Sequence, residues 1–122
     1  IATTTTIQQR SAGGGTGVDD ESVGYPEGNK RTSGFLMHER EWFTRLLERG
    51  WHDLLRVHIG PQKGPYTWWS NFRRARERDR GWRIDYVLAN DAAKSLMKSA
   101  EVMREGGLVV SDHAPVIVDF DL

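Results

Sequence analysis

The sequence predicts one small domain of the α+β class, in which helices and strands form a layered α/β arrangement. The first sign is a run of apolar residues at helical spacing over residues 38–49. The second is the alternation of side chains over residues 83–88, which is typical of a strand with two different faces. A further strand is predicted over residues 115–120. A chain of 122 residues has room for a single such domain.

The predicted helix over residues 38–49 has signals at both ends. Glu39 and Glu41 lie in its first turn, where the helix dipole favours acidic side chains. Gly50 follows its last residue and is a typical helix stop. We expect the helix to pack on a sheet, with Trp42 in the core beside the other apolar residues of its inner face, which are Phe43, Leu46 and Leu47.

The remaining elements are short. Residues 51–56 predict a turn or short helix, in which Asp53 and Arg56 are spaced for a local ion pair. Within the strand over residues 83–88, Arg83 and Asp85 share one face. The other predictions are strand composition over residues 66–70, a short helix over 91–98, a weak strand over 100–103 and a loop over 104–110.

The N-terminal segment differs from the rest of the chain. Residues 1–30 contain a threonine run and a GGGTG run, with almost no apolar periodicity. Such a segment buries too little surface to offset its ordering entropy, so a flexible loop or disordered segment is predicted. A phosphate-binding glycine loop is disfavoured, because no strand precedes the glycines and no Gly-Lys-Ser/Thr follows them. The folded unit is therefore predicted over residues 31–122.

Composition narrows the classes of protein to consider. Acidic and basic side chains are equal in number, 17 of each, so the overall charge indicates no particular partner. The chain has no cysteine, which excludes disulfides, thiolate catalysis and zinc–sulfur sites within it. No apolar run approaches the length that spans a bilayer, so no membrane partner is expected.

Three residues near the C-terminal end predict chemistry on a phosphate. Asp85 lies in a strand that otherwise has core composition, and Asp112 and His113 directly precede the last strand. If Asp85 accepts a hydrogen bond from one ring nitrogen of His113, the other nitrogen faces a substrate as a base or as a donor to phosphate oxygen. Asp112 offers a hard oxygen ligand for Mg²⁺ or Mn²⁺. The alternative for Asp85 is a structural ion pair with Arg83.

An arginine-rich loop is predicted between residues 71 and 80. Its first arginines are Arg73, Arg74 and Arg76, and only two acidic side chains oppose the basic ones in this loop. Arginines in such a loop are suited to nucleic-acid phosphates. Trp68 and Trp82 flank the loop, and aromatic side chains beside basic loops stack on bases or wedge between them. The alternative is a solvated charged loop without a partner.

Several separated motifs resemble, in order and spacing, those of the exonuclease III/apurinic-apyrimidinic endonuclease family. The resemblance covers residues 29–122 and implies the C-terminal half of a four-layer α/β sandwich, with a mostly antiparallel sheet and flanking helices. The motifs are residues 66–70 (YTWWS), 81–86 (GWRIDY) and 111–115 (SDHAP), together with 33–36 (SGFL), 39–42 (EREW) and the pair Asp53 and Arg56.

The resemblance also implies a role for individual residues. Asp85 corresponds to the aspartate that orients the catalytic histidine, and His113 to that histidine, which contacts the scissile phosphate. Asp112 corresponds to a ligand of Mg²⁺ or Mn²⁺, with His113 sometimes counted beside it. Trp68 and Trp82 correspond to aromatic positions that line the pocket for a flipped-out abasic sugar, whose extraction costs least because no base is stacked there.

The function that the resemblance implies is metal-dependent DNA repair. The enzyme would incise double-stranded DNA 5′ to abasic sites and trim 3′ ends. The family's upstream metal ligands, its catalytic tyrosine and its Gly-Asp-x-Asn motif are not found in these residues. We therefore expect a C-terminal fragment whose partner is the N-terminal half of the same domain.

Two alternatives stay open. The first is that the chain alone is inactive and at most binds nucleic acid. The second is that it belongs to a superfamily relative acting on RNA or another phosphodiester. No targeting signal is recognised near Ile1, which predicts a cytoplasmic location or one wherever the DNA lies.

Overall fold

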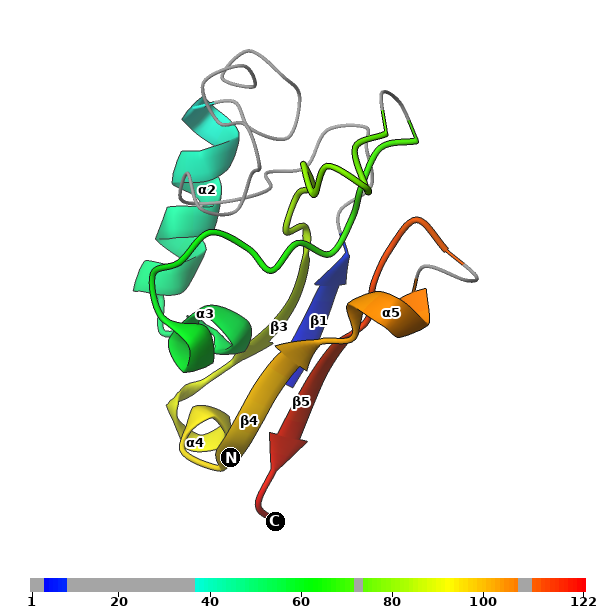
Figure 1. Cartoon of the computed structure of the whole chain (residues 1–122). Helices are drawn as coiled ribbons and strands as arrows, with labels where there is room; N and C mark the ends of the chain where they lie inside the picture. The colour runs from blue at the N-terminus through cyan, green and yellow to red at the C-terminus, as the bar shows by residue number, and fades with distance from the viewer. Residues whose placement is uncertain (1–3, 9–36, 72–73, 108–110) are drawn as a thin grey trace.

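Two antiparallel sheets form the strand layers of the fold (Figure 1). The computed structural model describes residues 4–8, 37–71, 74–107 and 111–122. β3 (Asp85–Ala89) is the central strand of the first sheet, with β1 (Thr4–Gln8) on one side and β2 (His52–Asp53) on the other. β4 (Met97–Val102) and β5 (Val116–Phe120) form the second sheet. Every strand pairing among these residues is antiparallel, which confirms that part of the predicted fold class.

Helices flank the sheets, as the fold class predicts. The long helix α2 (Met37–Glu48) confirms the amphipathic helix read from the sequence. α3 (Leu54–Ile59) begins at an N-cap aspartate, Asp53, whose side chain accepts a hydrogen bond from the backbone N–H of Arg56 at 3.3 Å. The short helices α4 (Asp91–Lys94) and α5 (Arg104–Gly107) follow β3 and β4.

Two apolar clusters show how these layers stack on β3. On one face of the strand, Tyr86 and Leu88 pack against Phe43 of α2. On the other face, Val87 and Ala89 contact the cluster that contains Leu54 of α3 and the second sheet's Met97, Val118 and Phe120. The order of layers is therefore α2, the first sheet, then the second sheet with α3. The alternation of the β3 side chains fixes which residues meet which layer.

Three of the local predictions are corrected, two of them by strand pairing. The sequence predicts loop throughout residues 1–30, but Thr4–Gln8 forms β1 because its backbone pairs with β3; residues 1–3 and 9–30 lie outside the described residues. The helix predicted over 91–98 ends at Lys94, because the chain enters β4 and pairs with β5 from Met97 onward. The loop predicted over 104–110 contains α5, and residues 108–110 are not described.

The placement of Trp42 is also corrected. Its side chain is 48% exposed, whereas the adjacent Phe43 is fully buried against β3. Helical geometry turns neighbouring residues about 100° apart, so only one of these two aromatic rings faces the sheet fully. None of the helices within the described ranges has both the length and the apolar character that crossing a membrane requires.

Tyr66 lies in a third apolar cluster, with Trp69 and Ala114. Burial of its ring, and secondarily the negative charge of Asp79, raise the pKa of the Tyr66 phenol above its ordinary 10.0. A raised pKa in the folded state favours the neutral phenol, so this contribution to stability is complete below the unfolded-state value and is lost as pH rises through the folded-state value.

We expect Tyr66→Phe to flatten this loss at high pH. The free energy of unfolding of the unaltered protein should fall between about pH 9 and about pH 11 by more than that of the variant. Urea unfolding followed by circular dichroism at the two pH values measures both slopes. Equal slopes would mean that the phenol titrates alike in the folded and unfolded chain.

Candidate active site

The pair formed by Asp85 and His113 is the centre of the candidate site. Asp85 is the first residue of β3 and His113 precedes β5, yet His113 Nδ1 lies 2.8 Å from Asp85 Oδ2. The two side chains are partly exposed, 24% for His113 and 15% for Asp85. An ionised carboxylate only accepts hydrogen bonds, so in the neutral ring the proton lies on Nδ1 and Nε2 is free to accept another. The predicted contact between the two residues is therefore present, while their catalytic roles stay predictions.

Arg83 has a separate buried partner. Its Nη1 lies 2.6 Å from Asp53 Oδ2, and the two side chains are only 1% and 5% exposed. The guanidinium also lies 5.1 Å from the centre of the Tyr86 ring, whose hydroxyl donates to the Arg83 carbonyl. The alternative of an Arg83–Asp85 ion pair is therefore wrong. Arg83 pairs with the buried Asp53, and Asp85 pairs with the partly exposed His113.

The same contacts correct the local ion pair expected between Asp53 and Arg56. The Asp53 carboxylate caps α3 through the Arg56 backbone and pairs across the fold with Arg83. The Arg56 guanidinium donates to the carbonyls of Gly60 and Gln62, at 2.9 Å each. A spacing of three residues therefore predicted a partner for Asp53 that is close in sequence, whereas its buried partner is 30 residues away.

Asp112 lies beside the pair and is anchored from one side. Its Oδ2 accepts a hydrogen bond from Trp68 Nε1 at 3.0 Å, and its Oδ1 lies 4.0 Å from His113 Nε2. The Asp112 side chain is 47% exposed. The structure therefore places a half-exposed carboxylate next to the ring nitrogen that Asp85 does not contact.

The side chains of Asp112 and His113 fit a hard divalent metal ion in part. Within the described ranges, no group of three or more His, Asp and Glu side chains is close enough to hold a metal ion. Mg²⁺ commonly binds through one or two carboxylates, water and substrate phosphate, and Asp112 is suited to that mode. The imidazole of His113 is a ligand more typical of softer transition metals, so Asp112 is the better candidate of the two.

Two tryptophans border this group. Trp68 forms isolated antiparallel bridges with Trp82 on one side and His113 on the other. The two indole rings meet edge to face, with centroids 6.5 Å apart and planes at 84°. The segment predicted as a strand over residues 66–70 is thus an irregular connector that joins the segment before β3 with the loop that carries His113.

Gly81 makes this close approach possible. A Cβ at this position would lie 2.6 Å from Trp69 Nε1 and from Tyr66 Cβ, and 2.7 Å from the Trp68 carbonyl oxygen. Real Cβ atoms do not come this close to backbone and ring atoms. Glycine is therefore required at Gly81 so that the two segments can pack on each other.

The arginine-rich loop divides into outward and inward side chains. Arg74 is 80% exposed and pairs with Glu77. Arg76 turns inward, because its Nη2 donates to the Ser111 carbonyl at 2.9 Å and its guanidinium lies 5.9 Å from the centre of the Trp69 ring. Arg73 lies outside the described residues.

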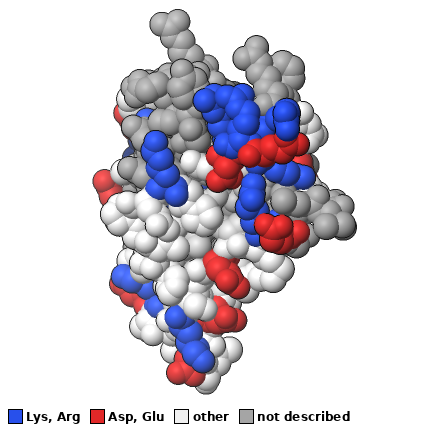
Figure 2. Space-filling model, in the orientation of Figure 1, with Lys and Arg blue, Asp and Glu red and all other residues white. Residues whose placement is uncertain are grey.

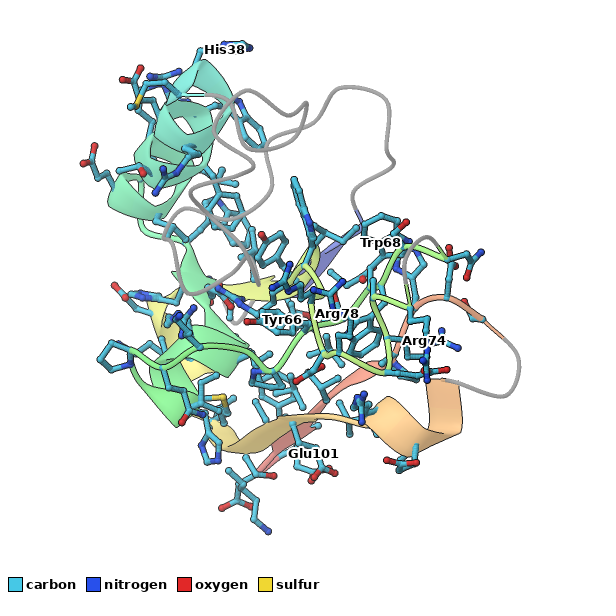
Figure 3. All side chains as sticks on the ribbon, turned by 45° about the horizontal axis from the view of Figure 1, so that its top comes forward. His38, Tyr66, Trp68, Arg74, Arg78 and Glu101 are labelled. Atoms are coloured by element: carbon cyan, nitrogen blue, oxygen red, sulfur yellow. The ribbon has the colours of Figure 1, made fainter. Side chains whose placement is uncertain are left out.

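The upper part of one face of the molecule is strongly charged. Figure 2 shows Lys and Arg side chains gathered at the top of the molecule, with acidic side chains directly beside them. Trp68 and Arg74 lie on the same side of the molecule, away from His38 and Glu101 (Figure 3). Trp68 and Trp82, which were predicted to bind substrate, therefore adjoin the candidate site. Arg74 lies on the same side of the molecule as Trp68, and Arg76 supports the loop before Asp112.

Sequence reasoning missed two supports of the site. One is the buried Arg83–Asp53 pair, and the other is Thr67, which is fully buried beneath Asp85. The sequence gives no local signal of such contacts. One support is a threonine within a strand-like motif, and the other joins two charged residues 30 positions apart. Only the three-dimensional pairing of the segments reveals them.

Comparison with known proteins adds sequence evidence to this geometry. Residues 33–113 match the model of the Endonuclease/Exonuclease/phosphatase family. The chain is 41% identical over 92 residues to an exodeoxyribonuclease of Bacillus subtilis, a match that covers 75% of this chain and 35% of that protein. It is 38% identical over 100 residues to a DNA-(apurinic or apyrimidinic site) endonuclease of Dictyostelium discoideum, covering 80% of this chain and 27% of that one. The chain thus spans about a third of the length of these curated relatives.

Solved structures with a similar fold belong to the same kinds of protein. A 3′ phosphatase from Neisseria bound to a product DNA hairpin has a TM-score of 0.78 and 33% identity, covering 85% of this chain and 41% of its own. An AP endonuclease from Archaeoglobus fulgidus has a TM-score of 0.78 and 26% identity, with the same coverage. The neighbours therefore share the α/β sandwich architecture expected from the sequence.

Proposed function

Because the chain belongs to the endonuclease/exonuclease/phosphatase family, we propose that it contributes the histidine side of the active site of a divalent-metal-dependent DNA-repair nuclease. The proposed reaction is hydrolysis of a phosphodiester 5′ to an abasic site, with trimming of 3′ ends. The observation that carries the proposal is the Asp85–His113 pair beside the exposed Asp112. Relatives that are exodeoxyribonucleases and AP endonucleases support DNA as the substrate.

The proposed chemistry follows from the hydrogen bonds of the pair. Asp85 accepts from Nδ1 of His113, which orients the ring and stabilises its positive charge when Nε2 takes a proton. Nε2 then acts either as the base for water or, when protonated, as a donor to a phosphate oxygen. A Mg²⁺ or Mn²⁺ ion bound through Asp112 would supply charge neutralisation at the phosphate.

The aromatic and basic side chains suit DNA as the ligand. Trp68 and Trp82 form an edge-to-face pair beside His113, a surface against which a flipped-out sugar can pack. Arg74 is exposed, pairs with Glu77 and lies on the same side of the molecule as Trp68 (Figure 3), so it is suited to a phosphate of the same strand. These contacts favour a nucleic-acid phosphodiester over a small phosphate ester, which would need no such extended surface.

A graft tests the proposal. Residues 33–122 would replace the matched segment of the Bacillus subtilis exodeoxyribonuclease, and cleavage of a duplex with one abasic analogue would be assayed with Mg²⁺. We expect the graft to cut, and His113→Ala in the graft to reduce kcat by about 10²–10⁴-fold, the usual contribution of a general acid or base. A correctly folded graft that cuts equally well with His113→Ala would refute the proposed role of His113.

A second candidate function is DNA binding without hydrolysis by the 122 residues alone. The possible metal ligands among the described residues favour this function, because they include one suitable carboxylate, that of Asp112, and no group of three side chains that could hold a metal ion. Incubation of the unaltered chain with the same duplex separates the two readings. Cleavage that disappears in His113→Ala would exclude the binding-only function, and a matched RNA duplex tests the alternative of an RNA substrate.

We expect Arg74 to contribute to DNA affinity by contacting a phosphate of the DNA backbone. In the graft, Arg74→Gln is expected to weaken binding of all duplex sequences alike and to reduce the slope of log K against log salt by about 1. Arg45→Gln, on an exposed position of α2, is the matched control and should leave the slope unchanged. Fluorescence anisotropy across a salt series measures both. An unchanged slope for Arg74→Gln would remove this arginine from the DNA contact surface.

A further inference from the structure

Thr67 has the densest set of hydrogen bonds around the candidate site. Its side chain is completely buried. The hydroxyl oxygen accepts from the backbone N–H of Ile84 at 2.9 Å and from that of Asp85 at 3.1 Å, and it lies 3.4 Å from the Trp82 carbonyl. A threonine hydroxyl has two acceptor lone pairs and one donor, so these three contacts use its full capacity.

The backbone of Thr67 reaches the other half of the pair. Its carbonyl accepts from the N–H of Ala114, the residue after His113, at 2.8 Å. Its own N–H donates to the Trp82 carbonyl at 2.9 Å. One buried residue is therefore bonded both to Asp85 itself and to the neighbour of His113 (Figure 3 labels Tyr66 and Trp68 on either side of it in the chain).

Regular strand pairing does not supply the hydrogen bonds that Thr67 makes. β3 begins only at Asp85, and β5 begins after His113. Between them the segment around Thr67 forms isolated bridges rather than a continuous ladder. The N–H groups of Ile84 and Asp85 are donors at the entry to a strand, and such donors need an acceptor when they are buried.

We propose that Thr67 is a positioning residue that sets the distance between Asp85 and His113, an inference that rests on the proposed function of the pair. Its hydroxyl fixes the backbone from which Asp85 projects. Its carbonyl fixes the backbone next to His113. Loss of the hydroxyl would leave two donors without their acceptor, and Asp85 would shift relative to the ring.

Thr67→Val tests this because it keeps the shape of the side chain and removes the hydroxyl. The readout is the ¹⁵N spectrum of the histidine rings in the 122-residue chain, which reports the tautomer of each ring. In the unaltered protein His113 should carry its proton on Nδ1. Thr67→Val should lower the ratio of the Nδ1–H to the Nε2–H form by about tenfold, and Thr67→Ser, which retains the hydroxyl, should preserve it.

Two controls distinguish a local effect on the Asp85–His113 pair from a general loss of structure in the variant. His52 forms a second His–Asp pair, with Asp91, so its ring should be unchanged in the same spectrum. Thr44→Val removes a hydroxyl that donates to the Arg40 carbonyl within α2, and it should leave His113 unchanged. An equal response of His52 and His113 to Thr67→Val would overturn the proposal, as would an unaltered His113 ratio.

Amide exchange in the unaltered protein covers the case in which Thr67→Val does not fold. The N–H groups of Ile84 and Asp85 should be protected, and in Thr67→Ser their protection should persist. Exchange at the rate of exposed amides would overturn the proposal. Neither readout requires catalysis, so a nuclease-inactive graft would refute the proposed function while leaving these results to decide the role of Thr67.

Discussion

Arg83→Met is expected to lower the free energy of unfolding by about 3–5 kcal/mol. The substitution leaves the Asp53 carboxylate buried, 5% exposed, without the guanidinium that lies 2.6 Å from it. The stacking of the guanidinium on Tyr86 is lost as well. A loss of this size is a large fraction of the stability of a small domain. Urea unfolding of the 122-residue chain, followed by tryptophan fluorescence, measures it.

The double variant Arg83→Met/Asp53→Asn shows where the loss comes from. Asparagine still caps α3 but carries no charge, so part of the stability should return. Arg45→Met, at an exposed position of α2, is the control and should change stability by no more than about 0.5 kcal/mol. If Arg83→Met costs as little as the control, the buried pair does not stabilise the fold.

Asp85→Asn in the exodeoxyribonuclease graft should reduce kcat by about 10²–10⁴-fold with little change in the fold. The amide has nearly the same shape as the carboxylate, but it carries no charge to stabilise a protonated His113. It can also donate to Nδ1, which would move the ring proton to Nε2, the nitrogen proposed to face the substrate. Single-turnover cleavage of the abasic duplex measures the chemical step.

The matched control is Asp119→Asn in β5. Asp119 carries an exposed carboxylate that accepts a hydrogen bond from the Ser99 hydroxyl in the second sheet. Its replacement should leave kcat unchanged. A graft that keeps its full rate with Asp85→Asn would show that the carboxylate is dispensable for His113.

The sequence predicted best those elements whose signals are local. α2, β3 and β5 follow from periodicity within a few residues, because one face of each is buried. β1 was not predictable in this way, because a polar threonine run becomes a strand only through its pairing with β3, which lies some 80 residues later. The boundary between α4 and β4 depends on β5 in the same manner.

The site shows the same division. Motif order brought Asp85, Asp112 and His113 into one hypothesis, and the structure places them together. The inward turn of Arg76 was not visible in a loop that reads as uniformly basic, because it depends on the Ser111 carbonyl 35 residues away. Thr67 escaped notice because the two groups that donate to its hydroxyl are 17 and 18 residues distant and both are backbone N–H groups.

The wide sequence separation of the site contacts has a kinetic consequence. Trp68 and Asp112 are 44 residues apart, and Asp85 and His113 are 28 apart, whereas α2 and the caps of α3 and α4 are local. Closing such long loops costs entropy before any contact repays it, so these contacts are expected to form after the folding barrier has been crossed. Substitutions in the site should then leave the refolding rate nearly unchanged and mainly accelerate unfolding.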